Sequence, residues 1–85
     1  KLTTQQILIE AARGIDERFD GLPELAAETR LMVGELMFEL QMFDEADRQL
    51  NNAIAAIKAR QGKHDPRVIQ AMAIQGRLWT ELGRA

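Results

Sequence analysis

The sequence predicts an all-α protein of antiparallel helical hairpins packed side by side, and three observations support this fold class. Four stretches place apolar residues at helical spacing, whereas no stretch alternates apolar and polar residues over the length of a strand. Breaks of only a few residues separate these stretches, which makes successive helices antiparallel neighbours. The pattern of the second stretch recurs in the fourth, as expected of a helical repeat. The 85 residues are enough for one small domain.

The first helix is predicted over residues 3–20, in front of the repeat. Thr3 and Gln6 have the spacing of a capping box, in which each side chain accepts a hydrogen bond from the other residue's backbone N–H. The sequence Asp-Gly-Leu-Pro at 20–23 ends this helix. Its predicted buried stripe comprises Leu8, Ala12, Ile15 and Phe19.

One complete hairpin is predicted over residues 23–64. Pro23 suits the first turn of its first helix, where a missing N–H is no loss, and this helix runs to about Leu40. After a short turn, Asp44 is the expected N-cap of the second helix, and Gly62 is placed to end it. The apolar face of the second helix comprises Ala46, Leu50, Ala53, Ile54 and Ile57.

The fourth helix is predicted over residues 66–83, with Asp65 as its N-cap and Pro66 in its first turn. It carries more apolar side chains than one neighbouring helix can bury. We therefore expect a fragment of a longer protein, in which a further helix after Ala85 covers the rest. These side chains are Val68, Ile69, Met72, Ile74, Leu78, Trp79 and Leu82.

Gly34 and Gly76 occupy equivalent places, 42 residues apart, in the second and fourth helices. Glycine inside a helix costs about 1 kcal/mol relative to alanine. A recurring interior glycine therefore indicates that a neighbouring helix occupies the space of the missing Cβ. At the same offset Leu36, Met37, Glu39 and Leu40 fall on Leu78, Trp79, Glu81 and Leu82.

These residues resemble the tetratricopeptide repeat family. Gly34 matches the family's small residue midway along the first helix, and Phe43 matches the aromatic before the second helix. Ala46 and Ala53 match its two alanines, whereas Gln41 replaces the usual turn glycine. The resemblance implies a fragment of a right-handed solenoid with four helices.

The 42-residue period and the Gly-x-x-x-Pro connector at 62–66 resemble the kinesin-light-chain-like variety of this family. Residues 23–64 then form one complete repeat, and residues 66–83 form the first helix of a second. The leading helix and the Leu-Pro-Glu-Leu junction at 22–25 resemble the repeat regions of bacterial serine/threonine protein kinases and transcriptional regulators.

The resemblance implies a non-catalytic protein-interaction module, or scaffold, of a larger bacterial regulatory or signalling protein. In such repeats the first helices of successive hairpins line a groove that binds a protein or peptide. The residues expected in this groove are Glu28, Arg30, Glu35 and Arg77. The alternative is a structural segment that self-associates or positions a kinase or DNA-binding domain. Its expected homodimer contacts are Val68, Met72, Trp79 and Leu82.

Composition narrows the other possible functions. A net charge of −2 and a pI near 5.3 argue against a general nucleic-acid binder. A basic cluster surrounds the connector between the third and fourth predicted helices. We interpret it as a solvated helix end, and nucleic-acid binding through this cluster is a third, disfavoured alternative. The chain has no cysteine, which fits a reducing compartment and a cytoplasmic location, and no apolar run approaches the ~20 residues of a membrane span. The basic cluster comprises Lys58, Arg60, Lys63 and Arg67.

No catalytic, cofactor or metal site is expected from the sequence. His64 is the single histidine, and its neighbour Asp65 is already needed as an N-cap. The carboxylates of Asp44, Glu45 and Asp47 fall near the start of a helix, where the exposed N–H groups favour negative charge. Most of the four methionines are expected in the core, with Met42 near solvent.

Overall fold

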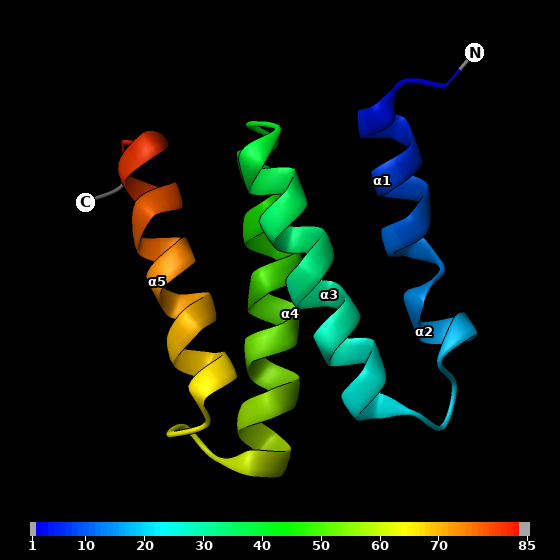
Figure 1. Ribbon diagram of the computed structural model, residues 1–85, viewed down its shortest axis with the longest axis vertical. Coiled ribbons are helices and arrows are strands. Elements are labelled where there is room, and N and C mark those ends of the chain that lie inside the picture. Colours follow the sequence, from blue (N-terminus) through cyan, green and yellow to red (C-terminus); the bar gives the residue numbers. More distant parts are fainter. Residues whose placement is uncertain (1, 84–85) are drawn as a thin grey trace.

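The protein is built from helices, which confirms the predicted all-α class. The computed structural model describes residues 2–83, and no strand occurs within that range. Residues 1, 84 and 85 of the predicted domain lie outside it. The helices are α1 (Thr4–Arg13), α2 (Ile15–Arg18), α3 (Pro23–Glu39), α4 (Phe43–Gln61) and α5 (Pro66–Glu81) (Figure 1).

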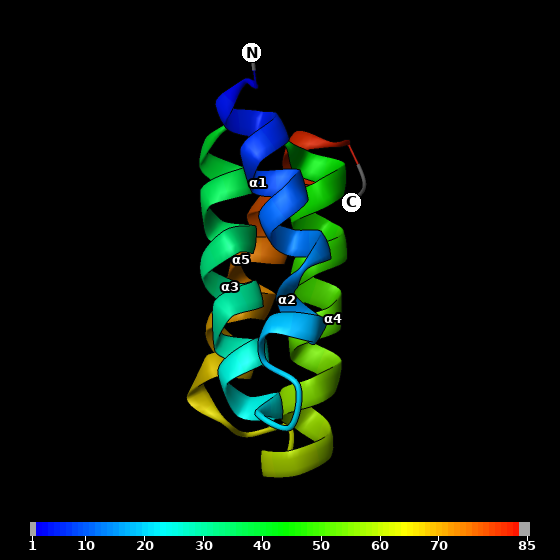
Figure 2. The same ribbon diagram turned by 90° about the vertical axis from the view of Figure 1, so that its right-hand side faces the viewer.

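The helices form three layers. The α3–α4 hairpin lies in the middle, α1 and α2 cover one side of it, and α5 covers the other (Figures 1 and 2). The resulting slab measures 37 × 34 × 14 Å. Because the slab is one hairpin thick, α3 and α4 each keep one face outside the core.

The predicted first helix is two helices, so residues 2–83 contain five helices rather than four. Gly14 lies between α1 and α2 with φ −89° and ψ 0°, outside the helical region. Glycine favours such a break because it holds helical geometry poorly. The capping box at Thr3 and Gln6 is confirmed, with bonds of 2.9 and 3.1 Å. The predicted stripe is also confirmed, since Ala12 and Ile15 are buried and Leu8 and Phe19 are half-buried.

A tight turn joins α3 to α4. The Met42 N–H donates to the Met37 carbonyl at 2.8 Å, and the Gln41 N–H donates to the Phe38 carbonyl at 3.0 Å. This pair of bonds is a Schellman motif, whose central residue adopts a left-handed conformation and is usually glycine. Gln41 adopts it here with φ 63°. Gln41 therefore has the backbone conformation of the turn glycine that it replaces.

Asp44 is not the N-cap of α4. The helix begins at Phe43, directly after the turn, and Met42 occupies the cap position without a side-chain hydrogen bond. Asp44 lies inside the first turn, where its charge still favours the helix. The other two predicted boundaries are confirmed. Gly62 ends α4 with φ 88°, and the Asp65 carboxylate caps α5 by accepting from the Arg67 N–H at 2.8 Å.

The core lies between the three layers. Its largest fully buried side chains are Ile15, Met37, Leu50, Val68 and Leu78. Gly34 lets α4 approach α3 closely, as its position predicted. A Cβ on Gly34 would lie 3.0 Å from both Cγ and Cδ2 of Leu50 and 3.6 Å from the Ala46 carbonyl oxygen. The same expectation is wrong for Gly76, because a Cβ there would meet nothing within 4 Å among the described residues.

Candidate protein-binding surface

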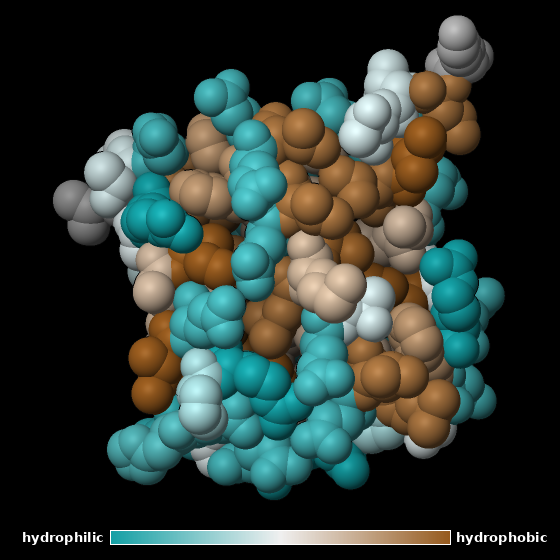
Figure 3. All heavy atoms as spheres, viewed as in Figure 1, coloured by the Kyte–Doolittle hydropathy of each residue, from teal (hydrophilic) through white to brown (hydrophobic). Residues whose placement is uncertain are grey.

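The face that α3 presents to the viewer in Figure 1 has two characters. Hydrophobic side chains gather over the upper half of α3 and over α1, whereas hydrophilic side chains gather at the lower end, between α3 and α5 (Figure 3). Glu28 on α3 belongs to the lower end. Glu35 on α3 and Arg77 on α5 belong to the upper end. Three of the four predicted groove residues therefore lie along the border between α3 and α5.

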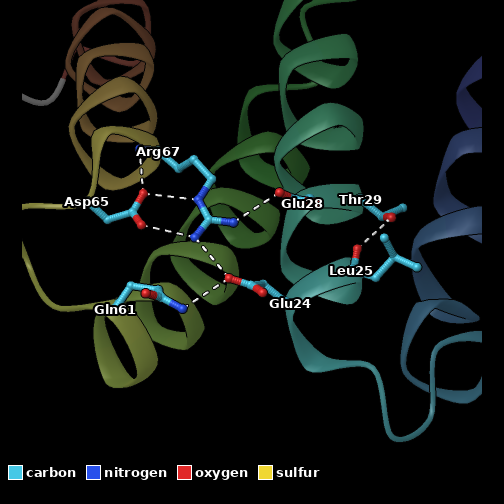
Figure 4. Close-up of polar contacts among 7 residues, drawn as sticks. All are labelled: Glu24, Leu25, Glu28, Thr29, Gln61, Asp65 and Arg67. Atoms are coloured by element: carbon cyan, nitrogen blue, oxygen red, sulfur yellow. Dashed lines mark hydrogen bonds and ion pairs between the residues drawn. The ribbon is translucent and has the colours of Figure 1, made fainter.

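At the lower end, Arg67 ties the start of α5 to α3 (Figure 4). Its guanidinium donates to Glu28 at 3.0 Å and to Glu24 at 3.3 Å. It also donates twice, at 3.0 Å each, to the Asp65 carboxylate. These bonds hold the pKa of Asp65 below its usual value, because they favour the charged carboxylate. Gln61 adds a bond of 3.1 Å to Glu24.

The predicted basic cluster is therefore not a uniform solvated patch. Arg67 is three-quarters buried within ion pairs, whereas Lys58, Arg60 and Lys63 are exposed. His64 is exposed on the connector between α4 and α5.

At the upper end, Arg77 stacks on an aromatic ring of α3. Its guanidinium carbon lies 5.3 Å from the centre of the Phe38 ring, which is a cation–π distance. Both side chains line a hollow with Ile74, Glu35 and Glu39. The hollow joins α3 to α5 and combines an apolar floor with charges of both signs.

Arg30, the fourth residue predicted for the groove, lies away from the border between α3 and α5. Its side chain is only 13% exposed, forms an ion pair with Asp16 of α2 and donates to Gln49 of α4 at 3.1 Å. Arg30 follows Glu28 by two residues, which rotates it by about 200° around the helix axis. It thus belongs to the packed side of α3 and fastens that helix to α2 of the neighbouring layer and to α4 of its own hairpin.

The predicted self-association residues divide between core and surface. Val68 is fully buried and therefore cannot belong to an exposed apolar face, and Leu82 is half-buried. Met72 is 50% exposed and Trp79 is 40% exposed. Ile69, which the sequence analysis did not include among these contacts, is 58% exposed on the same helix. The 42-residue offset contained the signal for Ile69. It aligns Ile69 with Ala27, which lies in the core, so Ile69 is on the helix face that a neighbour covers in α3.

Trp79 is anchored at its polar edge. Its indole N–H donates to Asp47 of α4 at 2.9 Å, and Gln75 donates to the same oxygen at 3.0 Å and to Asn51 at 2.7 Å. Gln75 is buried, so these bonds satisfy a polar group in the interface between α4 and α5. Asp47 therefore positions the tryptophan, a role that sequence spacing did not indicate.

An apolar stripe on α3 was also missed. Leu25, Met32 and Leu36 are exposed, with Met32 at 64%, and Leu40 follows directly after the helix. Intervals of seven and four residues place the three on one helix face, so the spacing contained the signal. The expectation that most methionines are buried is wrong for Met32 and Met72. Met37 is fully buried and Met42 half-buried.

None of the helices in the described part of the chain is both long and apolar enough to cross a membrane. Within residues 2–83, no three acidic or histidine side chains come together in a way that could hold a metal ion. Comparison with protein-family models, with curated proteins and with solved structures found no match to this chain.

Proposed function

We propose that the chain is a non-catalytic protein-binding module that uses the outward face of α3 and its border with α5. The observation that carries this proposal is the hollow between Glu35 and Arg77, which lies next to the exposed stripe on α3. Binding surfaces typically combine such an apolar centre with a polar rim.

The proposal includes a tetratricopeptide-like arrangement. In this reading α3 and α4 form one complete repeat, α5 is the first helix of the next, and α1 and α2 precede the repeat. The close contact of Gly34 with Leu50 supports it, because the family uses a small residue at this point of the hairpin. Stacked repeats would then continue the groove along the first helices, as a scaffold of a regulatory or signalling protein requires.

Selection from a random peptide library tests the proposed function. The protein is attached to the support through Lys58 on α4, away from the proposed surface, and selected peptides are mapped by amide chemical-shift changes. We expect the changes to cluster on α3 and α5 and to disappear in the double variant Glu35→Lys, Arg77→Glu. The proposal fails if no peptide is enriched, or if the enriched peptides bind this variant as well as the parent protein.

Self-association through α5 is a second candidate, favoured by a specific observation. Ile69, Met72 and Trp79 are exposed apolar side chains on one helix, beside the open space at Gly76. A two-fold homodimer would bury the same patch on both copies, and such a dimer could position a kinase or DNA-binding domain.

Sedimentation at several concentrations tests the dimer. Met72→Glu and Trp79→Glu should each give monomers, because both would bury a charge in the contact. Met32→Glu is the matched control, since it changes an exposed methionine on α3 instead and should leave the dimer intact. A parent protein that is monomeric at every concentration contradicts this candidate, and so does a dimer that survives Met72→Glu.

A further inference from the structure

The exposed stripe on α3 has acidic residues along one side. Glu24, Glu28, Glu35 and Glu39 lie along its α5 side, and the last two line a hollow together with Ile74 and Arg77 of α5. We propose that this surface binds a basic amphipathic helix of a partner protein, whose apolar side chains cover Leu25, Met32 and Leu36 and whose lysines or arginines meet Glu35 and Glu39. This inference rests on the proposed function and adds the chemistry of the partner.

The shape of the stripe suits a helix. Met32 and Leu36 form the apolar part of a shallow hollow that Glu35 and Glu39 complete. Leu25 lies two turns earlier and lines a second hollow with Leu22, Pro23 and Glu28. Side chains seven residues apart lie on the same face of a helix. A partner helix packed alongside α3 could therefore place one such side chain in each of the two hollows.

The charges select the sign of the partner. Arg67 pairs with Glu24 and Glu28, whereas Glu35 and Glu39 have no ion pair among residues 2–83. Glu35 and Glu39 are one helical turn apart, where like charges repel. Arg77 lines the same hollow, but its guanidinium lies over the Phe38 ring and within 4 Å of neither carboxylate. A cation from a partner would relieve this repulsion, whereas an acidic partner would add to it.

Two designed peptides test the proposal directly. Both are amphipathic helices of about 18 residues, or five turns, with the same leucine face. One has lysine on its polar face and the other has glutamate. We expect fluorescence anisotropy to show binding of the lysine peptide and at least about tenfold weaker binding of the glutamate peptide. Such a difference corresponds to about 1.4 kcal/mol.

Variants separate this site from general attraction to an acidic protein. The double variant Glu35→Gln, Glu39→Gln should weaken binding of the lysine peptide, and Met32→Ser should weaken binding of it as well. The matched control Glu17→Gln, Asp20→Asn removes two negative charges from exposed residues beyond this surface and should leave the affinity unchanged. Circular dichroism confirms that each variant is folded.

The results distinguish the inference from the proposed function. If both peptides bind α3 equally, or if the glutamine variant and the control lose affinity to the same extent, the partner is not selected by Glu35 and Glu39 and the inference fails. The proposed function stands in that case if library peptides still map to α3. If the lysine peptide and the library peptides all leave α3 unperturbed, both proposals fail.

Discussion

Helices α3 and α5 have the same residue pattern but different surroundings. Gly34 on α3 is buried against Leu50, whereas Gly76 on α5 faces open space. Met37 is fully buried, whereas its counterpart Trp79 is 40% exposed. The difference shows that glycines at equivalent places in two helices need not both lie against a neighbouring helix. Whether a neighbour is present depends on the rest of the structure.

The residues on the same two helix faces differ in apolar area and in exposure. Near Gly34, α3 has Ala27 and Arg30, both of which are covered by other helices. At the equivalent places α5 has Ile69 and Met72, which are larger in apolar area and exposed. The uncovered face is thus the more apolar of the two. In the proposed homodimer, this exposed face of α5 would be the contact surface.

The largest expected effect is at the covered glycine. Gly34→Leu should destabilise the protein by about 1–3 kcal/mol, because the new side chain meets Leu50 and the backbone of Ala46 in a filled core. Urea and thermal unfolding measure it, with Gly76→Leu as the matched control. An unchanged or higher melting temperature for Gly34→Leu, or equal destabilisation of both variants, would show that α4 does not need the missing Cβ at Gly34.

A smaller effect of opposite sign is expected at the open glycine. Gly76→Ala should stabilise the protein by up to about 1 kcal/mol, because alanine is the better helix former and its Cβ meets no atom of the described residues. Urea unfolding at low protein concentration measures this gain without a contribution from association. Destabilisation in the monomer would show that another group occupies the space next to Gly76.

Sequence reasoning succeeded for several local signals, although it placed the N-cap of α4 at Asp44 instead of Met42 and missed the break at Gly14. Gly62, the Asp65 cap and the capping box at Thr3 depend on a few neighbouring residues, and the structure confirms them. It failed where neighbouring helices decide the outcome. Arg30 faces the packed side of α3 because α2 and α4 offer Asp16 and Gln49, and Val68 is buried because α5 turns it inward. The interior glycine indicated the close contact at Gly34 but could not show which face of each helix stays open.

The third effect concerns Asp65, which caps α5 and binds the Arg67 side chain that contacts α3. The pKa of Asp65 is lower in the folded protein than its usual value of about 4 in an unfolded chain. The ionised carboxylate therefore stabilises the fold above about pH 4. This contribution is lost as the pH falls through the lower value of the folded state. Asp65→Asn keeps a cap oxygen but removes the charge that Arg67 contacts. Urea unfolding should show Asp65→Asn less stable than the parent protein near neutral pH, with the difference shrinking below about pH 4.

The matched control for this link is Asp20→Asn, an exposed carboxylate in the turn before α3. Its difference from the parent protein should depend less on pH. If Asp65→Asn and Asp20→Asn followed the same pH dependence, the ionised Asp65 carboxylate would not stabilise the fold through its bonds to Arg67.

The smallest effect is expected one residue earlier, at His64. This side chain is exposed on the connector, and no hydrogen bond or ion pair involves it among the described residues. His64→Ala should therefore change the free energy of unfolding by no more than about 0.5 kcal/mol, as is usual for exposed residues outside caps. Binding of the lysine peptide should also be unchanged, because His64 lies beyond the stripe on α3. The pair His64→Ala and Asp65→Asn thus compares neighbouring connector residues with opposite roles. Loss of peptide binding by folded His64→Ala would extend the functional surface to the connector and contradict its assignment to α3.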